Sequence, residues 1–113
     1  MRSGSPNPSF HAVLDESALA DNRMEIVELS DRKIVLIKSF GKVYALDNTC
    51  PHLGGSLGRG TLRDNSVICP LHHWTFDLMT GKCVSGVPDE RVATYETKVE
   101  NGKILVKWPD PKP

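Results

Sequence analysis

Two short segments of the sequence each place a cysteine close to a histidine. One residue separates Cys50 from His52, two residues separate Cys69 from His72, and sixteen residues lie between the two pairs. Thiolate sulfur and imidazole nitrogen are ligands that transition metals prefer in proteins. At these spacings one loop can supply two ligands, and the sixteen-residue link is long enough for a hairpin that returns the second loop beside the first. The sequence therefore predicts a four-ligand metal site.

The order of the ligands bears on which metal the site would take. Two cysteines and two histidines form a legitimate tetrahedral zinc set. Each segment here mixes one cysteine with one histidine, however, whereas common zinc sites pair cysteine with cysteine and histidine with histidine. A two-iron cluster accounts for the mixed order, because one iron takes a cysteine from each loop and the other takes a histidine from each loop. A zinc-stabilised interaction module without a redox role stays open as the alternative from another class.

The residues around the ligands carry a family resemblance. The two segments read Cys50-Pro51-His52-Leu53-Gly54-Gly55 and Cys69-Pro70-Leu71-His72-His73-Trp74-Thr75-Phe76-Asp77. They closely resemble the two ligand motifs of the Rieske [2Fe-2S] family. The resemblance continues through Thr80-Gly81-Lys82 and through Gly86-Val87-Pro88, which is similar to the family's proline loop, and it covers nearly all of residues 10–108.

This resemblance implies one [2Fe-2S] cluster per chain and a role for each ligand. Cys50 and Cys69 would bind the inner, ferric iron, and His52 and His72 the outer, redox-active iron nearer to solvent. His73 does not fall on a ligand position. The resemblance also implies an antiparallel sandwich or barrel base with a small cluster-binding subdomain, whose loops span about residues 48–90.

Two departures from the respiratory-chain branch of the family concern the reduction potential. That branch has an extra cysteine in each motif, and the matching positions here are Gly55 and Leu71, so no disulfide can join the loops. The branch also has a hydroxyl group hydrogen-bonded to a bridging sulfur, at the position that Trp74 occupies. Because such a hydrogen bond stabilises the reduced cluster, its loss lowers the potential. We expect a value near the low end of the Rieske range, about −150 mV on a scale that reaches about +300 mV.

The remaining pattern of the chain predicts an all-β fold. Apolar runs at 24–29, 33–38 and 42–46 are separated by turn residues, which is typical of a three-stranded meander. Three further turn signals predict hairpins: Asp64-Asn65, Thr80-Gly81 and Asn101-Gly102. Only residues 15–22 are expected to be helical, over a short stretch. Strands at this spacing are typical of a sandwich or barrel.

The length, the net charge and the composition of the chain ends indicate which classes of function are not expected for this chain. A chain of 113 residues is expected to form one domain, which we place at residues 10–108 between a flexible tail at 1–9 and a Pro-rich tail at 109–113. Fourteen basic and fourteen acidic residues give no net charge, so the basic surface that nucleic acid or an anionic membrane requires is not expected. The apolar runs are too short to span a membrane. Without a secretory signal, and with only three cysteines, a cytoplasmic location is expected.

These observations together predict an electron carrier with no catalysis by itself. The sequence shows no nucleotide-binding fingerprint, no nucleophile elbow and no mononuclear iron triad. A reductase would reduce the cluster, and a terminal oxygenase such as an aromatic-ring dioxygenase would accept the electron. The small subunit of an NAD(P)H-dependent assimilatory nitrite reductase, acting with its large subunit, is the alternative. An apolar rim is expected to dock the partner, formed by Leu53, Leu71, Trp74 and Pro88.

Overall fold

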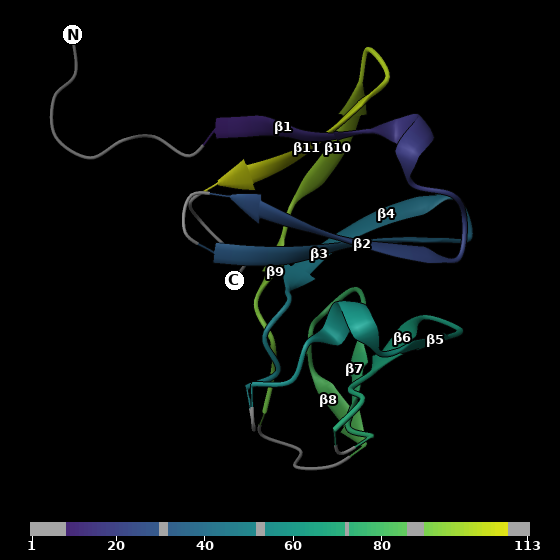
Figure 1. Cartoon of the computed structure of the whole chain (residues 1–113), viewed down its shortest axis with the longest axis vertical. Coiled ribbons are helices and arrows are strands. Elements are labelled where there is room, and N and C mark those ends of the chain that lie inside the picture. Colours follow the sequence, from purple (N-terminus) through teal and green to yellow (C-terminus); the bar gives the residue numbers. More distant parts are fainter. Residues whose placement is uncertain (1–8, 30–31, 52–53, 72, 86–89, 109–113) are drawn as a thin grey trace, which may run out of the picture.

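The computed structural model describes residues 9–29, 32–51, 54–71, 73–85 and 90–108 (Figure 1). Their regular structure comprises three antiparallel sheets and two 3-10 helices, Glu16–Ala18 and Leu57–Arg59. The predicted all-β fold is confirmed. The helical stretch expected at residues 15–22 is limited to the single turn Glu16–Ala18, because the flanking residues Asp15 and Leu19 are extended and so short a helix gains little from its own hydrogen bonds.

The sheet at the centre of the molecule has the strand order β2-β3-β4-β9. Its first three strands, β2 (Arg23–Leu29), β3 (Arg32–Ser39) and β4 (Lys42–Asp47), form the predicted meander, and the short strand β9 (Thr94–Tyr95) pairs with β4. Four consecutive residues of β3, Ile34 to Ile37, have no solvent exposure. An unbroken apolar run of this kind is typical of a strand covered on both faces.

A second sheet has the order β1-β11-β10. The strands β10 (Thr97–Glu100) and β11 (Lys103–Trp108) form the hairpin predicted at Asn101-Gly102, where both turn residues have positive φ. Strand β1 (Ser9–Asp15) pairs with β11, and a register shift between Ala12 and Leu14 interrupts it. This bulge breaks the alternation of side chains, which explains why the sequence pattern alone gives no strand signal there.

The third sheet carries the segments with the predicted ligands. Its strands are β5 (Thr61–Arg63), β6 (Ser66–Ile68), β7 (Thr75–Asp77) and β8 (Cys83–Ser85), paired in chain order. The hairpins predicted at Asp64-Asn65 and Thr80-Gly81 are therefore confirmed. The Asp77 carboxylate fixes the second turn by accepting hydrogen bonds from the Met79 and Thr80 backbone N–H groups and from the Thr80 hydroxyl.

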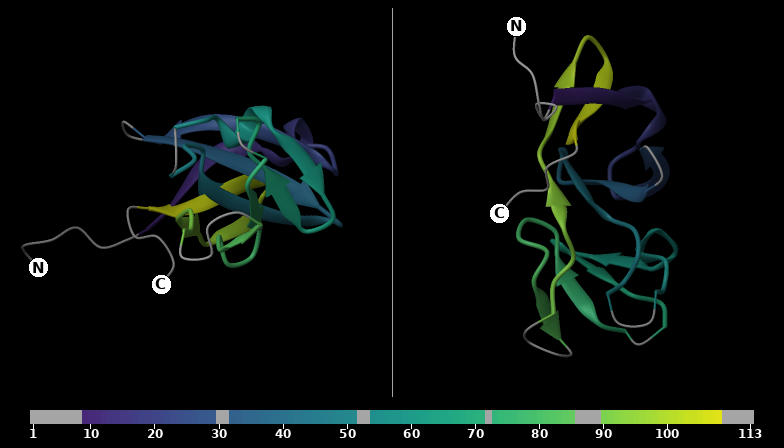
Figure 2. Two further views of the ribbon diagram at one scale, coloured as in Figure 1. Left: turned by 90° about the horizontal axis from the view of Figure 1, so that it is seen from below. Right: turned by 90° about the vertical axis from the view of Figure 1, so that its left-hand side faces the viewer.

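Strand β3 separates two hydrophobic cores. Ile34 and Leu36 pack with residues of the β1-β11-β10 sheet, whereas Val35 and Ile37 pack with residues of the β5–β8 sheet and its loops. The views agree with this arrangement: the β5–β8 sheet and the β1-β11-β10 sheet lie at opposite ends of the molecule, with β2, β3 and β4 between them (Figures 1 and 2). Of the residues in the tails predicted at 1–9 and 109–113, Ser9 belongs to β1, and the others lie outside the described residues.

Candidate metal centre

Cys50 begins a tight loop that follows strand β4. The Gly54 backbone N–H donates a hydrogen bond to the Cys50 carbonyl oxygen at 3.0 Å, and the Cys50 N–H donates to the Gly55 carbonyl oxygen at 2.8 Å. Gly54 has a φ of +75°, a conformation that glycine adopts without steric cost. The backbone thus closes on itself around Cys50 and fixes the position of this residue.

Cys69 begins a second loop with the same hydrogen-bond pattern. The His73 N–H donates to the Cys69 carbonyl oxygen at 2.9 Å, and the Cys69 N–H donates to the Trp74 carbonyl oxygen at 2.8 Å. His73 takes the place of Gly54 in the pattern and also has positive φ, +61°. Two segments far apart in the sequence therefore hold a cysteine at the same position of the same turn.

The two loops lie against each other. An ideal Cβ atom on Gly55 would lie 3.0 Å from Cγ and Cδ1 of Leu71 and 3.1 Å from Sγ of Cys69. Cys50 and Cys69 are 1% and 0% exposed and belong to one core cluster. All three cysteines of the chain, including the buried Cys83, are without a disulfide. Positions 55 and 71 are thus close together in the structure, and neither residue carries a sulfur atom.

The chain that follows residue 89 packs against the β7–β8 hairpin. The Val92 N–H donates to the Gly81 carbonyl oxygen at 2.8 Å, and the Cys83 N–H donates to the Glu90 carbonyl oxygen at 3.0 Å. A Cβ atom on Gly81 would collide with the Val92 carbonyl oxygen, so only glycine permits this approach. These contacts bring together the two flanks of residues 86–89, which themselves lie outside the described residues.

The structure places half of the predicted ligand set. Cys50 and Cys69 are brought together on matched loops, whereas His52 and His72 lie outside the described residues. Within the described ranges alone, no three His, Cys, Asp or Glu side chains are grouped for a metal ion. Two buried thiols on adjoining loops fit the sulfur half of a two-iron site, because soft thiolates select iron–sulfur clusters and zinc.

Two of the four rim residues can be examined in the same way. Leu71, which lies within the second loop, is 55% exposed, and Trp74 is partly buried against the core that contains Cys69. Leu53 and Pro88 lie outside the described residues. Leu71 is therefore available to a partner, whereas Trp74 packs toward the interior.

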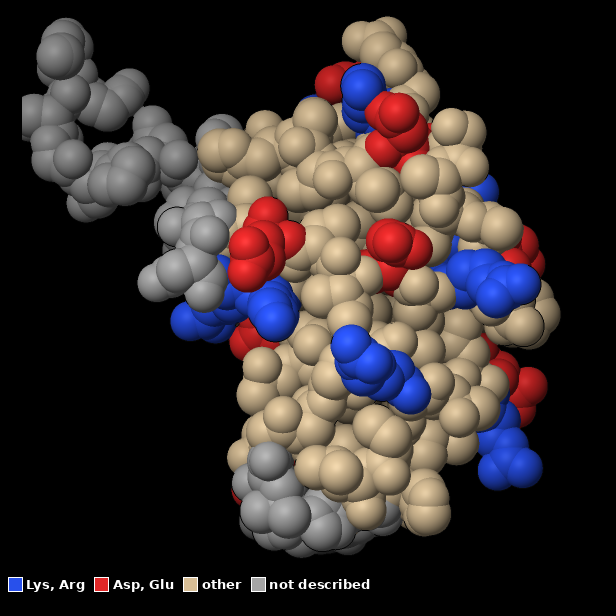
Figure 3. Space-filling model, in the orientation of Figure 1, with Lys and Arg blue, Asp and Glu red and all other residues tan. Residues whose placement is uncertain are grey.

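Charged side chains are missing from the segments that surround the cysteines. Residues 48–58, 65–76 and 83–88 contain no Lys, Arg, Asp or Glu. On the face shown in Figure 3, charged residues lie over the upper sheets and along the sides, and the described surface at the lower end is largely without them. The segments nearest to the two cysteines thus carry no charge, although charged residues such as Arg59, Asp77 and Lys82 directly flank them.

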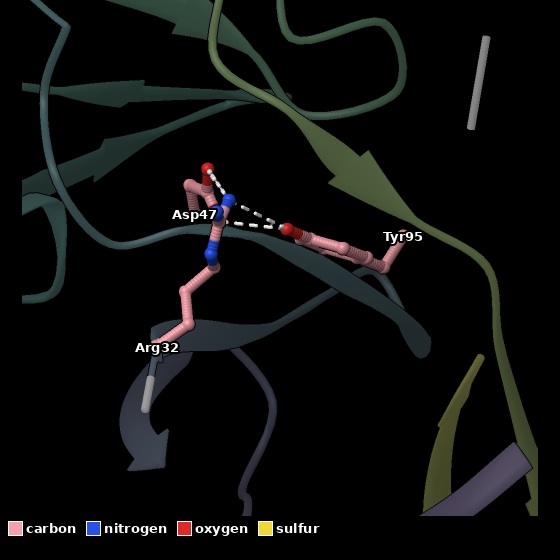
Figure 4. Close-up of polar contacts among 3 residues, drawn as sticks. All are labelled: Arg32, Asp47 and Tyr95. Atoms are coloured by element: carbon pink, nitrogen blue, oxygen red, sulfur yellow. Dashed lines mark hydrogen bonds and ion pairs between the residues drawn. The ribbon is translucent and has the colours of Figure 1, made fainter. Parts of the chain in front are cut away.

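A polar group that the sequence pattern did not single out lies where strand β4 ends. The Tyr95 hydroxyl donates to Oδ1 of Asp47 at 2.9 Å, and Nη1 of Arg32 donates to Oδ2 of Asp47 at 3.2 Å and to the Tyr95 hydroxyl oxygen at 3.5 Å (Figure 4). Burial and the neighbouring Asp47 carboxylate raise the pKa of Tyr95 to about 12. These side chains join β3, β4 and β9 just before the Cys50 loop, and only the folded chain brings them together.

Comparison with known sequences gives one family. A sequence model of the Rieske [2Fe-2S] domain matches residues 9–96. The ferredoxin component of the naphthalene 1,2-dioxygenase/salicylate 5-hydroxylase systems of Ralstonia sp. is 33% identical over 81 residues, which are 72% of this chain and 78% of that protein. Cholesterol 7-desaturase of Caenorhabditis elegans is 37% identical over 112 residues, 91% of this chain but 26% of the desaturase. The chain thus spans about a quarter of the desaturase.

Comparison with solved structures gives the same fold. A structure from Mycobacterium tuberculosis, described as an NADH-dependent nitrite reductase small subunit, matches with a TM-score of 0.83 and 25% identity, over 93% of this chain and 99% of that one. The part of the chain that the structure describes holds no helix long and apolar enough to cross a membrane.

Proposed function

This chain belongs to the Rieske [2Fe-2S] domain family, and on that premise we propose that it carries electrons from a reductase to a terminal oxygenase. The family predicted from the sequence is confirmed. A [2Fe-2S] cluster takes up and releases one electron at a time. The observation that carries the proposal is the pair of buried cysteines, Cys50 and Cys69, held on adjoining loops with the same backbone hydrogen bonds. We propose that the chain itself catalyses no reaction and serves as the electron-transfer component of an oxidoreductase system.

For the site, the proposal is that each chain holds one cluster through Cys50, His52, Cys69 and His72. The sulfur ligands would bind the inner iron and the imidazole ligands the outer iron. The burial of both cysteines supports their inner position, because a ligand in the core is shielded from solvent. An electron would then enter and leave on the histidine side.

We propose that the partner docks on the rim of Leu53, Leu71, Trp74 and Pro88. The exposed Leu71 side chain and the uncharged segments around the cysteines support an apolar contact. Such a contact gains its free energy from the apolar area that is removed from water, about 25 cal/mol per Å². We further propose that the carrier works in the cytoplasm and that its domain spans the predicted residues 10–108 together with Ser9 of β1, with tails before Ser9 and at 109–113.

The small subunit of an assimilatory nitrite reductase is the second candidate. The match to the Mycobacterium tuberculosis structure over nearly all of both chains favours it, and the ferredoxin component of Ralstonia sp. favours the oxygenase partner. Stopped-flow reoxidation of the reduced protein discriminates the two. We expect rapid reoxidation by a purified aromatic-ring dioxygenase and none by a nitrite reductase large subunit; the opposite result would select the second candidate.

Iron and sulfide analysis of the purified protein, with absorbance and EPR spectra of the reduced state, tests the proposal directly. We expect two irons and two sulfides per chain and a reduced-state EPR signal. One zinc per chain with no visible absorbance would instead identify the zinc-stabilised module. His52→Ala and His72→Ala should each abolish the normal EPR signal, whereas Cys83→Ala, at a buried cysteine that is not a proposed ligand, should retain it.

A further inference from the structure

The two cysteine loops are closed at their bases in different ways. The second loop leaves and re-enters a strand ladder, because Ile68 of β6 pairs with Thr75 of β7 immediately outside it. In the first loop, the described residues 48–51 and 54–58 pair through the isolated bridge between Thr49 and Ser56 and through no longer ladder. The first loop must therefore be held by other interactions if Cys50 is to keep its place beside the second loop.

Asn48 supplies those interactions. Its backbone N–H donates to the Lys33 carbonyl oxygen at 3.0 Å, whereas its carbonyl oxygen accepts from the Leu57 N–H at 2.7 Å as part of the Thr49–Ser56 bridge itself. Its side chain acts in both directions: Nδ2 donates to the Ser56 hydroxyl oxygen at 2.9 Å, and Oδ1 accepts from the Gly58 N–H at 2.7 Å. Asn48 is 5% exposed, so solvent cannot easily replace these partners.

The contact between Asn48 and the returning end of the loop requires a side-chain amide at position 48 and a glycine at position 58. An asparagine side chain offers a donor and an acceptor at one point, whereas a carboxylate has no donor and an aliphatic chain has neither. A Cβ atom on Gly58 would collide with the Ile26 side chain and lie 3.0 Å from Oδ1 of Asn48. The returning end of the loop reaches Asn48 only because residue 58 has no side chain.

We propose that Asn48 is a positioning residue for the cluster, which ties the Cys50 loop to strand β3 in place of a strand pair. The inference rests on the proposed role of Cys50 as a ligand. The backbone N–H of Asn48 anchors the residue to β3 at Lys33, and its side-chain amide holds the far end of the loop at Ser56 and Gly58. Asn48 would act on Cys50 through the backbone of residues 49–51 and 54–58, which its contacts hold in place.

The test compares three variants of the purified, cluster-loaded protein. Asn48→Ala removes both side-chain hydrogen bonds, and Ser56→Ala removes one. Ser39→Ala is the matched control, because Ser39 is equally buried and its hydroxyl donates to the Asp64 carbonyl oxygen at 3.2 Å, away from the Cys50 loop. The readouts are the rate at which a chelator bleaches the visible absorbance, the EPR g values of the reduced protein, and amide hydrogen exchange.

Cluster loss requires the loop to open, and opening becomes easier by the free energy of each hydrogen bond removed. We expect bleaching to be at least about tenfold faster in Asn48→Ala and about threefold faster in Ser56→Ala, with shifted g values in Asn48→Ala. Ser39→Ala should keep the rate and g values of the parent. Amide exchange should rise for residues 54–58 in Asn48→Ala and not for Cys69 or His73.

Unchanged bleaching and g values in Asn48→Ala and Ser56→Ala would overturn the proposal, as would equal acceleration in Ser39→Ala. If Asn48→Ala does not fold, the bleaching rate of Ser56→Ala relative to Ser39→Ala decides whether the proposal holds. A parent protein without iron and sulfide would contradict the proposed function, and amide exchange of the protein as purified would then still test whether Asn48 holds the loop.

Discussion

Gly55 and Leu71 face each other across the two cysteine loops, with the Cβ position of Gly55 3.0 Å from Cγ of Leu71. Since Cγ is one bond from Cβ, the two Cβ positions are no more than about 4.5 Å apart, so they do not exceed the separation that a disulfide can span. The two positions are thus close enough for a link between the loops, although neither residue carries a sulfur atom.

We predict that the double variant Gly55→Cys/Leu71→Cys forms this disulfide. Non-reducing peptide mapping by mass spectrometry checks the pairing, and the two single variants serve as controls. In the loaded protein the link should slow cluster loss, because both loops must then open together. Unpaired thiols at positions 55 and 71, or pairing of either with Cys69, would contradict the expected geometry.

Because Gly54 and His73 both have positive φ, substitutions at these two positions should change the free energy of unfolding in opposite directions. His73 has a φ of +61°, which costs a non-glycine residue free energy, and it is not a proposed ligand. His73→Gly should therefore raise the free energy of unfolding, by about 0.5–1 kcal/mol, and keep the iron content. Gly54→Ala, at a φ of +75°, should lower the free energy of unfolding by a similar amount. Thermal unfolding with iron analysis measures both, and loss of iron in His73→Gly would show that His73 serves the metal.

Transfer of electrons to the oxygenase should depend little on ionic strength. Residues 48–58, 65–76 and 83–88 carry no charged side chain, and screening acts only on charges. We expect the second-order rate of reoxidation to change less than about twofold between roughly 50 and 500 mM salt. Leu71→Ala should reduce the rate at subsaturating oxygenase, whereas Val99→Ala, at an exposed apolar residue of β10, should not. A steep salt dependence would indicate docking through charged surfaces elsewhere.

Tyr95 should make the stability of the fold decrease at high pH. The unfolded chain loses the Tyr95 proton near the ordinary pKa of 10.0, and the folded chain only near about 12. Between these values the unfolded state binds fewer protons, so raising the pH favours unfolding. Tyr95→Phe should cost about 1–2 kcal/mol at pH below 10, and this difference from the parent should shrink as the pH approaches 12.

Urea unfolding at a series of pH values measures this effect, with Tyr44→Phe as the control at the chain's other tyrosine. A difference between parent and Tyr95→Phe that is constant up to pH 12 would mean that the hydroxyl titrates alike in both states.

The parts of the fold that could be predicted from the sequence are those with local causes. Turn residues such as Asn101 and Gly102 fix their hairpins through their own φ preferences, and the spacing of Cys50 and Cys69 from their histidines indicates a metal site without knowledge of the fold. The roles of Asn48 and Tyr95 could not be predicted in this way. Each depends on partners that only the folded chain brings near, ten residues away for Gly58 and 48 away for Asp47.

Strand β3 has a consequence for how the molecule unfolds. Its even-numbered residues Ile34 and Leu36 belong to the core shared with β11, and its odd-numbered residues Val35 and Ile37 belong to the core around the cysteines. Detaching the β5–β8 sheet would expose one face of this strand, and detaching the β1-β11-β10 sheet would expose the other. Strand β3 is thus covered by both cores, so the loss of either end sheet would leave one face of this strand open to water.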